Sequence, residues 1–356
     1  MTIKIAIAGI GNCASALIQG IHHYKDADEN SQIPGLMHVK FGEYHISDIE
    51  PVAAFDVNKN KIGKDLSEAI FTEPNCCYKF TTPPKLGVKV LPAPTLDSVA
   101  PHMKEPFKAH NNSDPTNVSQ VLKETNADML INFLPVGSYK ATRYYAQACL
   151  DAKVAFINCI PEFIASDPTW ARKFEENGIP IAGDDIKSQI GATIIHRAIT
   201  SLLIERGVKI EETYQLNVGG NTDFQNMMDN RRLSTKRISK TEAITSLIPY
   251  KTQAWAGPNG FIPFLKDKKI CYLQIKGRKF GGAPVTIDLK LTVEDSPNSA
   301  GMVIDVIRAV KIALDRKIAG PLISISAYAF KHPPQQVPDH IAKQWVEEFI
   351  QGKRSR

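Results

Sequence analysis

The sequence IKIAIAGIGNCASALIQGI, residues 3–21, decides the fold. Its first part, Ile3–Ala8, is a short apolar run with the length and composition of a buried parallel strand. Glycines follow at positions 9 and 11, and apolar residues then recur at helical spacing, namely Ala14, Leu17, Ile18 and Ile21. A strand, a glycine turn and a helix in this order predict the opening unit of an α/β fold with a parallel sheet.

The turn has the spacing of a dinucleotide-binding loop, Gly9-x-Gly11-x-x-Ala14, and it contains Asn12 and Cys13. Gly9 permits the tight turn, and Gly11 lets the backbone approach a pyrophosphate at the helix N-terminus. Ala14 is small enough for close packing of the helix on the strand. We therefore expect this loop to bind a dinucleotide, with a purely structural tight turn as the alternative.

Asp56 ends a second predicted strand, residues 51–56. A carboxylate at this place accepts the ribose hydroxyls and repels a 2′-phosphate, which favours NAD over NADP. Asp56 lies 47 residues after Gly9, whereas the common pattern has about 20. The polar insert at 25–50 accounts for this spacing only if it is an excursion from the strand–helix–strand unit.

The remaining chain divides into two patterns. Strands and helices alternate from residue 129 to residue 206, which predicts a parallel sheet with helices on both faces. Apolar residues alternate with polar ones over 285–293, typical of an antiparallel-type sheet. We expect an α/β protein whose Rossmann domain, residues 1–200 and 297–356, carries an inserted α+β domain, residues 201–296. Residues 71–120 are rich in proline and are expected to be mostly loop.

The charge of the chain is concentrated in one segment. The 356 residues carry a net charge of +6, and residues 231–279 hold twelve basic and two acidic residues, so the rest of the chain is −4. Nucleic acid, an anionic surface and a phosphorylated small molecule are the candidate partners. The segment lacks the interleaved aromatic residues and the recognised modules of a nucleic-acid binder. No apolar run approaches the roughly 20 residues of a membrane span, and six cysteines without CxxC spacing favour the cytoplasm.

Several polar residues stand where ligands bind in such folds. Lys236 and Lys240 share one face if their segment is helical, and this costs a few tenths of a kcal/mol unless an anion lies between them. Two solvated lysines are the alternative. Residues 184–189 and 295–299 each follow a predicted strand and open a helix, so they line a site or simply cap the helices. The asparagine-rich stretch 218–226 binds sugar hydroxyls or forms a surface loop.

The motifs together resemble the myo-inositol-1-phosphate synthase family in its shorter bacterial and archaeal form. They are AGIGNCASALIQG, GLMHVKFGEYHISDIEPVAAFDV, GDDIKSQIGATIIHR, LNVGGNTDFQNM, RLSTKRISKT, GRKFGG, VEDSPNSAG and SAYAFKHPP, and they span nearly the whole chain. The resemblance also explains the long insert, which the family carries. It implies conversion of glucose 6-phosphate to inositol 3-phosphate with NAD regenerated in each cycle, an inserted domain for catalysis and tetramerisation, and a homotetramer.

The resemblance also implies roles for individual residues. The catalytic residues are Lys236, Lys240, Lys269, Lys331 and Asp295, with Lys268 able to replace Lys269. Asp185 and Ser188 match positions near the nicotinamide. Asn221, Thr222 and Asp223 match a sugar-phosphate region, and a divalent metal cation at Asp223 is an expectation for archaeal-type members. A net NAD-dependent dehydrogenase of another sugar phosphate or small metabolite is the alternative function.

Overall fold

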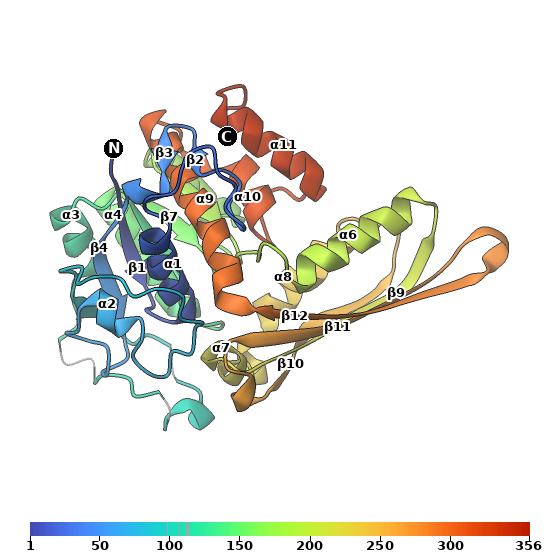
Figure 1. Ribbon diagram of the computed structural model, residues 1–356, viewed down its shortest axis with the longest axis horizontal. Coiled ribbons are helices and arrows are strands. Elements are labelled where there is room, and N and C mark those ends of the chain that lie inside the picture. The colour runs from blue at the N-terminus through green and yellow to red at the C-terminus, as the bar shows by residue number, and fades with distance from the viewer. Residues whose placement is uncertain (98, 106, 112–113) are drawn as a thin grey trace.

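The structure, a computed structural model, describes residues 1–97, 99–105, 107–111 and 114–356 and contains two main sheets (Figure 1). The larger sheet has seven parallel strands in the order β13-β8-β7-β6-β1-β4-β5. These are β1 (Ile3–Ala8), β4 (Ile49–Asp56), β5 (Val90–Pro92), β6 (Met129–Asn132), β7 (Ala155–Asn158), β8 (Pro180–Gly183) and β13 (Gly320–Pro321). Every residue of β6, β7 and β8 is buried, because helices cover the sheet on both faces. The expected parallel α/β fold is confirmed.

Helices on opposite faces of this sheet follow from right-handed crossovers that run towards opposite edges. Helix α1 joins β1 to β4, whereas α4 and α5 follow β6 and β7 towards the other edge; Figure 1 shows α1 beside the long helix α9. The bounds are α1 (Asn12–His23), α2 (Leu66–Ala69), α3 (Val118–Glu124), α4 (Tyr139–Ala152), α5 (Pro168–Glu176), α9 (Asp295–Asp315), α10 (Ile323–Ala329) and α11 (Asp339–Ile350). Across the described residues, every helix is too short or too polar to cross a bilayer.

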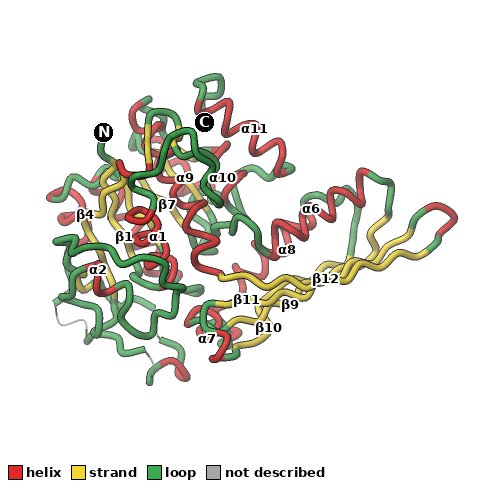
Figure 2. Tube along the Cα trace, viewed as in Figure 1, coloured by secondary structure: helices red, strands yellow, loops and turns green. Residues whose placement is uncertain are grey.

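The second sheet projects from the first as a long arm (Figures 1 and 2). Its strands are β9 (Lys209–Gly219), β10 (Gln253–Phe261), β11 (Lys268–Arg278) and β12 (Pro284–Glu294), in the order β10-β9-β11-β12. The alternation expected over 285–293 is present in β12, and its apolar side chains pack against a small separate core. The sheet is mixed, since β9 and β10 run parallel while β11 is antiparallel to both its neighbours.

Three further helices accompany the arm: α6 (Ala192–Glu205), α7 (Thr222–Asn226) and α8 (Ser234–Thr245). Helix α6 packs against α8, β9 and β11, and its Leu203 shares a core with Ile210 and Leu273 of the arm. The division at residue 201 stays a prediction. This packing favours a boundary before α6, because the helix buries its apolar side against the second sheet.

The insert at 25–50 is an excursion that packs against α9. It contains the short strands β2 (Lys40–Phe41) and β3 (Tyr44–His45). The buried guanidinium of Arg308 on α9 donates to the carbonyl oxygens of His38 (2.8 Å) and Val39 (2.6 Å). Asp56 therefore still ends the strand next to β1, despite the long sequence gap. Within residues 71–120, expected to be mostly loop, the structure has the three-residue strand β5. The seven-residue helix α3, which was not predicted, begins at Val118 and runs past the end of this region.

The turn after β1 requires glycine at its first position. Gly9 has a φ of +87°, and a Cβ atom there would lie 2.9 Å from the carbonyl oxygen of Phe133. Gly63 has a similar φ of +83° with no atom within 4 Å of its Cβ position. A substitution at Gly63 therefore measures the cost of the left-handed backbone alone, without steric overlap.

Gly9→Ala should lower the free energy of unfolding by about 2–5 kcal/mol, measured by urea denaturation. The left-handed backbone costs roughly 1–2 kcal/mol and the overpacking about 1–3 kcal/mol. Gly63→Ala should show only the first cost. Equal losses in the two variants would contradict the close approach at Gly9.

Candidate active site

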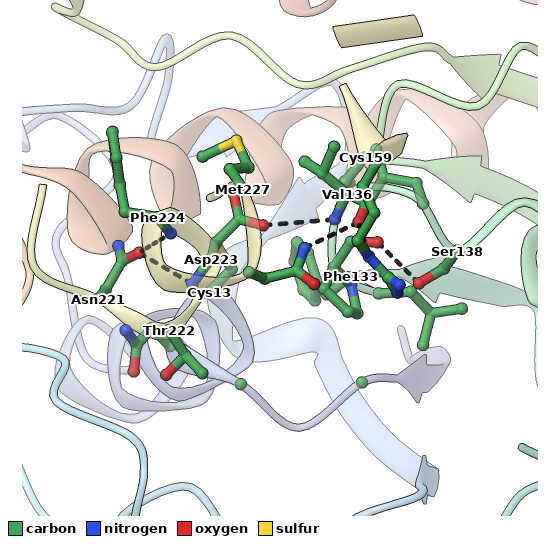
Figure 3. A pocket seen from close by; sticks show the side chains of 18 of the residues that line it. Cys13, Phe133, Val136, Ser138, Cys159, Asn221, Thr222, Asp223, Phe224 and Met227 are labelled. Carbon is green, nitrogen blue, oxygen red and sulfur yellow. Dashed lines mark hydrogen bonds between the residues drawn. The ribbon is translucent and has the colours of Figure 1, made fainter. Parts of the chain in front are cut away.

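The strand order of the large sheet reverses between β1 and β6, and a pocket opens at their carboxyl ends. The turn at Gly9 and the segment 133–138 after β6 form its floor. The arm contributes the other wall through α7, α8 and β11, so the pocket lies between the two sheets. Figure 3 shows Cys13, Phe133 and Ser138 of the first part facing Asp223 and Met227 of the second.

One end of the pocket fits a dinucleotide. Gly11 precedes α1 with no side chain capping the helix, and the space around its Cβ position is empty to 4 Å. The N–H groups of the first turn are thus free for an anion, which the helix dipole also favours. Ala14 is fully buried where α1 meets the sheet. Asp56 accepts the N–H groups of Ile10 (2.8 Å) and Asn58 (2.7 Å), which leaves lone pairs on both oxygens for ribose hydroxyls.

Asn12 and Cys13 line the pocket but also hold the glycine loop in place. The Asn12 side-chain oxygen accepts the N–H of Cys76 at 2.8 Å. The Cys13 sulfur accepts a bond from the Ser299 hydroxyl at 3.6 Å, and burial raises the pKa of its thiol to about 12. A protonated, buried thiol has little nucleophilic character. Ser188 lies in the wall of the same pocket.

Asp185, which follows β8, binds two lysines from distant parts of the chain. Its Oδ1 atom lies 2.9 Å from the Nζ of Lys236 on α8 and 3.0 Å from the Nζ of Lys331, which follows α10. Lys331 also donates to the carbonyl oxygen of Ile186 at 2.6 Å, and the hydroxyl of Ser239 donates to the second Asp185 oxygen. Three residues predicted from separate motifs therefore meet in one buried cluster.

The charges of this cluster follow from burial and pairing. Burial alone would raise the pKa of Asp185, but Lys236 and Lys331 outweigh it and hold that pKa below its usual value. Burial opposes the charged form of Lys236 as well, yet the carboxylates of Asp185 and Asp223 keep its pKa raised. Burial lowers the pKa of Lys331 to about 8 in spite of Asp185. Lys236 is therefore a fixed ammonium group, whereas Lys331 can exchange a proton near neutral pH.

Lys240 lies one helical turn after Lys236 and is only 5% exposed. Burial lowers the pKa of Lys240 well below its usual value, and three neighbouring lysines lower it further. These are Lys269, Lys236 and Lys331. Within the described part of the chain, Lys240 has no hydrogen-bond or ion-pair partner. Desolvation and cationic neighbours both favour the neutral amine form of a lysine, which can accept a proton.

The opposite wall is formed by the start of β11 and the start of α9. The Nζ of Lys269 lies 2.9 Å from Oδ1 of Asp295. Burial raises the pKa of Asp295, but Lys269, Lys331 and Lys236 together outweigh burial and the net pKa is lowered, so the carboxylate is charged. Lys268 is exposed and does not line the pocket, so the structure places Lys269 and not its neighbour in this wall.

The segment predicted to bind the sugar phosphate caps α7. The Asn221 side-chain oxygen accepts two backbone N–H groups of the first turn of α7, and Asp223 accepts the N–H of Val136 at 3.3 Å (Figure 3). Thr222 donates to the carbonyl oxygen of Pro74 at 3.4 Å. Asn221, Thr222 and Asp223 all line the pocket. Because the Asn221 side-chain oxygen caps α7, this side chain can offer a ligand only its amide N–H group as a donor.

A divalent metal at Asp223 does not fit this geometry. Among the described residues, no group of three or more His, Cys, Asp or Glu side chains is arranged to hold a metal ion. Burial raises the pKa of Asp223, and a single carboxylate falls far short of the oxygen shell that Mg²⁺ or Ca²⁺ requires. We derive no step through a metal.

The sequence analysis missed Asp267, which connects three residues of the pocket lining, Asn12, Asn221 and Ser296. This carboxylate is 1% exposed and accepts the N–H of Ser296 at 3.1 Å and the side-chain amides of Asn221 (3.2 Å) and Asn12 (3.4 Å). Burial, followed by the charge of Asp295, raises the pKa of Asp267 to about 7. The available signal was a lone acid inside the strongly basic stretch 266–269.

The Rossmann-type sheet and the lysine-lined pocket define an enzyme of the α/β class. Residues 191–296 match the family model described as myo-inositol-1-phosphate synthase. The inositol-3-phosphate synthase of Corynebacterium glutamicum is 50% identical over 98% of each chain. That of Mycobacterium tuberculosis is 50% identical over 98% of this chain and 96% of its own length. A myo-inositol-1-phosphate synthase-related protein from Thermotoga maritima has 26% identity and a TM-score of 0.84, over 99% of both chains.

The chain belongs to the myo-inositol-1-phosphate synthase family, as the motif resemblance indicated. The family consists of enzymes with an NAD-binding Rossmann-type fold, which agrees with the parallel sheet described above.

Proposed function

We propose that this chain converts D-glucose 6-phosphate into 1D-myo-inositol 3-phosphate. The reaction runs through oxidation at C5, removal of a proton from C6, attack of C6 on the C1 aldehyde, and reduction at C5. Oxidation and reduction cancel, so the overall change is an isomerisation. The observation that carries the proposal is the unpaired, desolvated amine of Lys240 among three further lysines, in the same pocket as the dinucleotide cradle.

NAD is the proposed cofactor, and when bound it accepts a hydride from the sugar and returns it in the last step. The loop Gly9–Ala14 would hold its pyrophosphate and Asp56 its ribose. Asp185 and Ser188 line the pocket towards the lysines, at the end where the nicotinamide would meet the sugar. Family membership and the fold support this assignment.

The lysines divide the chemistry between proton transfer and charge stabilisation. Lys240 is the proposed base, because burial and its neighbouring lysines lower its pKa well below the ordinary value and so favour the amine form that can accept a proton. Lys236, kept charged by Asp185, would stabilise negative charge on the sugar oxygens as it develops at C5 and then C1. Lys331, with a pKa near 8, can donate a proton to these oxygens.

The far wall would hold the remainder of the substrate. Lys269 carries a cation against Asp295, and this pair can bind a phosphate or a sugar hydroxyl. Asn221, Thr222 and Asp223 lie along the same side of the pocket and are the proposed contacts to the sugar phosphate. The pocket thus meets an anionic substrate with ammonium groups on two sides.

We further place the enzyme in the cytoplasm as a homotetramer. All six cysteines are free thiols, as in a reducing compartment. The outer face of the arm sheet exposes Tyr214 (37%), Trp255 (44%) and Tyr272 (45%), and Phe280 at the hairpin tip is fully exposed. Such an aromatic face supports a self-complementary contact with a second copy of the chain.

Incubation of the protein with glucose 6-phosphate and NAD should yield inositol 3-phosphate, identified by NMR, without accumulation of NADH. The reason is that the hydride removed from C5 returns to the same carbon. Stoichiometric NADH together with a linear oxidised sugar phosphate would contradict the proposal and indicate a net dehydrogenase.

Lys240→Ala should reduce turnover by at least about 10²–10⁴-fold, the contribution of a positioned base, while NAD binding measured by calorimetry stays largely intact. Lys268→Ala removes the same charge at an exposed site nearby and should leave turnover unchanged. Wild-type activity should fall as the pH is lowered through the pKa of Lys240, because the base becomes protonated. Unchanged turnover in Lys240→Ala would refute the assignment.

Trp255→Glu should convert the assembly into smaller species in native mass spectrometry, because a buried, unpaired carboxylate is unfavourable at an interface. Tyr78→Ser removes an exposed aromatic residue from the large domain and serves as the control. An unchanged mass for Trp255→Glu would place the contact elsewhere.

A further inference from the structure

Lys187 lies between two proposed site residues but takes no part in the pocket wall. Asp185, Ile186 and Ser188 line the pocket, whereas Lys187 points into the protein and is 0% exposed. Its Nζ donates to the carbonyl oxygen of Ala327 at 2.9 Å and to Oδ1 of Asp339 at 3.0 Å. A fully buried ammonium is costly unless it is paired and hydrogen-bonded, so Asp339 is needed to hold it.

The second oxygen of Asp339 binds another buried cation. Arg197 on α6 donates from Nε to Oδ2 of Asp339 at 2.6 Å. Its other nitrogens donate to the carbonyl oxygens of Ala243 (2.5 Å) and Val337 (2.7 Å), and its side chain is 0% exposed. The guanidinium of Arg197 on α6 thus binds two other segments, helix α8 and residues 337–339, with its donors in a fixed planar arrangement.

The segments that meet at Asp339 are those that carry the lysine cluster. Lys187 belongs to the loop of Asp185, and Ala243 lies three residues after Lys240 on α8. Asp339 opens α11, and the segment before it is tied to Lys331 by the Gln336 amide, which donates to the Lys331 carbonyl oxygen at 2.6 Å. The two oxygens of the Asp339 carboxylate therefore connect α11 to the Asp185 loop through Lys187 and, through Arg197, to helix α8.

We propose that Asp339 is a positioning residue that sets the distance between the Asp185 loop and helix α8 through its bonds to Lys187 and Arg197. The inference rests on the proposed function of the lysine cluster, whose geometry it explains. A gain in stability does not by itself explain such a network, because replacing a buried ion pair by apolar residues of similar volume often leaves the protein equally stable. Alignment of three segments within a fraction of an ångström is the role that only fixed hydrogen bonds provide.

The charges around Lys187 give this role a pH signature. Burial lowers the pKa of Lys187 to about 8, Asp339 on α11 raises it, and Arg197 on α6 lowers it. Loss of the Asp339 charge would lower the Lys187 pKa further. Lys187 would then become neutral at a lower pH than in the wild type, and its bond to residue 339 would weaken as the pH rises.

The test compares Asp339→Asn with Asp305→Asn. Asp305 pairs with Arg308 in an ion pair on α9 that touches none of the proposed site residues, and its side chain is 1% exposed against 32% for Asp339. Asp339→Asn should lower kcat roughly 10- to 100-fold with KM changed less than about threefold, since misplacement of about 1 Å costs up to 10²-fold. Its alkaline loss of activity should also move to lower pH, and Asp339→Glu should recover most of the wild-type profile. Asp305→Asn should lose stability in urea but keep kcat and the pH profile.

Equal effects of Asp339→Asn and Asp305→Asn on kcat, or an unshifted pH profile in Asp339→Asn, would overturn the proposal. Amide hydrogen exchange gives a readout that does not depend on the reaction. Asp339→Asn should speed exchange in residues 184–190 and in α8, whereas Asp305→Asn should not. If the wild type fails to make inositol 3-phosphate, the proposed function fails, and exchange still decides whether Asp339 holds these segments. Unchanged exchange in both segments would exclude the positioning role.

Discussion

The paired contact of Asp185 with Lys236 and Lys331 is the interaction on which the rest of the site depends. One buried carboxylate neutralises part of the charge of two ammonium groups that arrive from α8 and from the segment after α10. Without that carboxylate, three lysines would have to share a buried space, at a cost of several kcal/mol. Because Asp185 is occupied by these two, Lys240 is left without a partner, and its lowered pKa is a consequence of the arrangement.

This contact also explains the two-part architecture. The Asp185 loop is fixed by the parallel sheet, whereas α8 belongs to the arm, so the lysine cluster exists only when both parts are packed together. The proposed dinucleotide loop lies on the sheet side of the pocket, whereas Lys236, Lys240 and Lys269 come from the arm side. A substrate between them would meet both, which is the requirement for a hydride step and a ring closure at neighbouring carbons.

Only part of the basic charge of the chain is available to bind a ligand. The basic segment 231–279 does not form a continuous basic patch, because part of its charge is paired across strands of the arm. Lys276 lies 2.7 Å from Glu212, and Arg278 lies 2.8 Å from Glu211. Such exposed pairs contribute little to stability, about 0–1 kcal/mol, but they cancel the local field. The functional part of the charge is the small set of lysines inside the pocket.

The sequence predicted those features that depend on local patterns. Gly9 was predicted because the turn between the first strand and helix needs glycine, and Asp56 because an acid ends the second strand. The parallel sheet was predicted from the alternation of strands and helices along the chain. The proposed catalytic lysines came from motifs and not from periodicity. Asp267 and Asp339 were missed because their roles arise from partners more than 100 residues away, such as Asn12 and Lys187, and no spacing rule encodes such contacts.

The central claim is that burial and neighbouring lysines lower the pKa of Lys240 well below that of an ordinary lysine, which favours its neutral amine form. The most direct measurement is the titration of its Nζ by NMR on lysine-labelled protein, with the signal assigned by its absence in Lys240→Ala. The account predicts a titration well below the ordinary lysine value of 10.5, in contrast to Lys236, whose pKa is raised. A Lys240 that stays an ammonium up to the ordinary value would contradict the account.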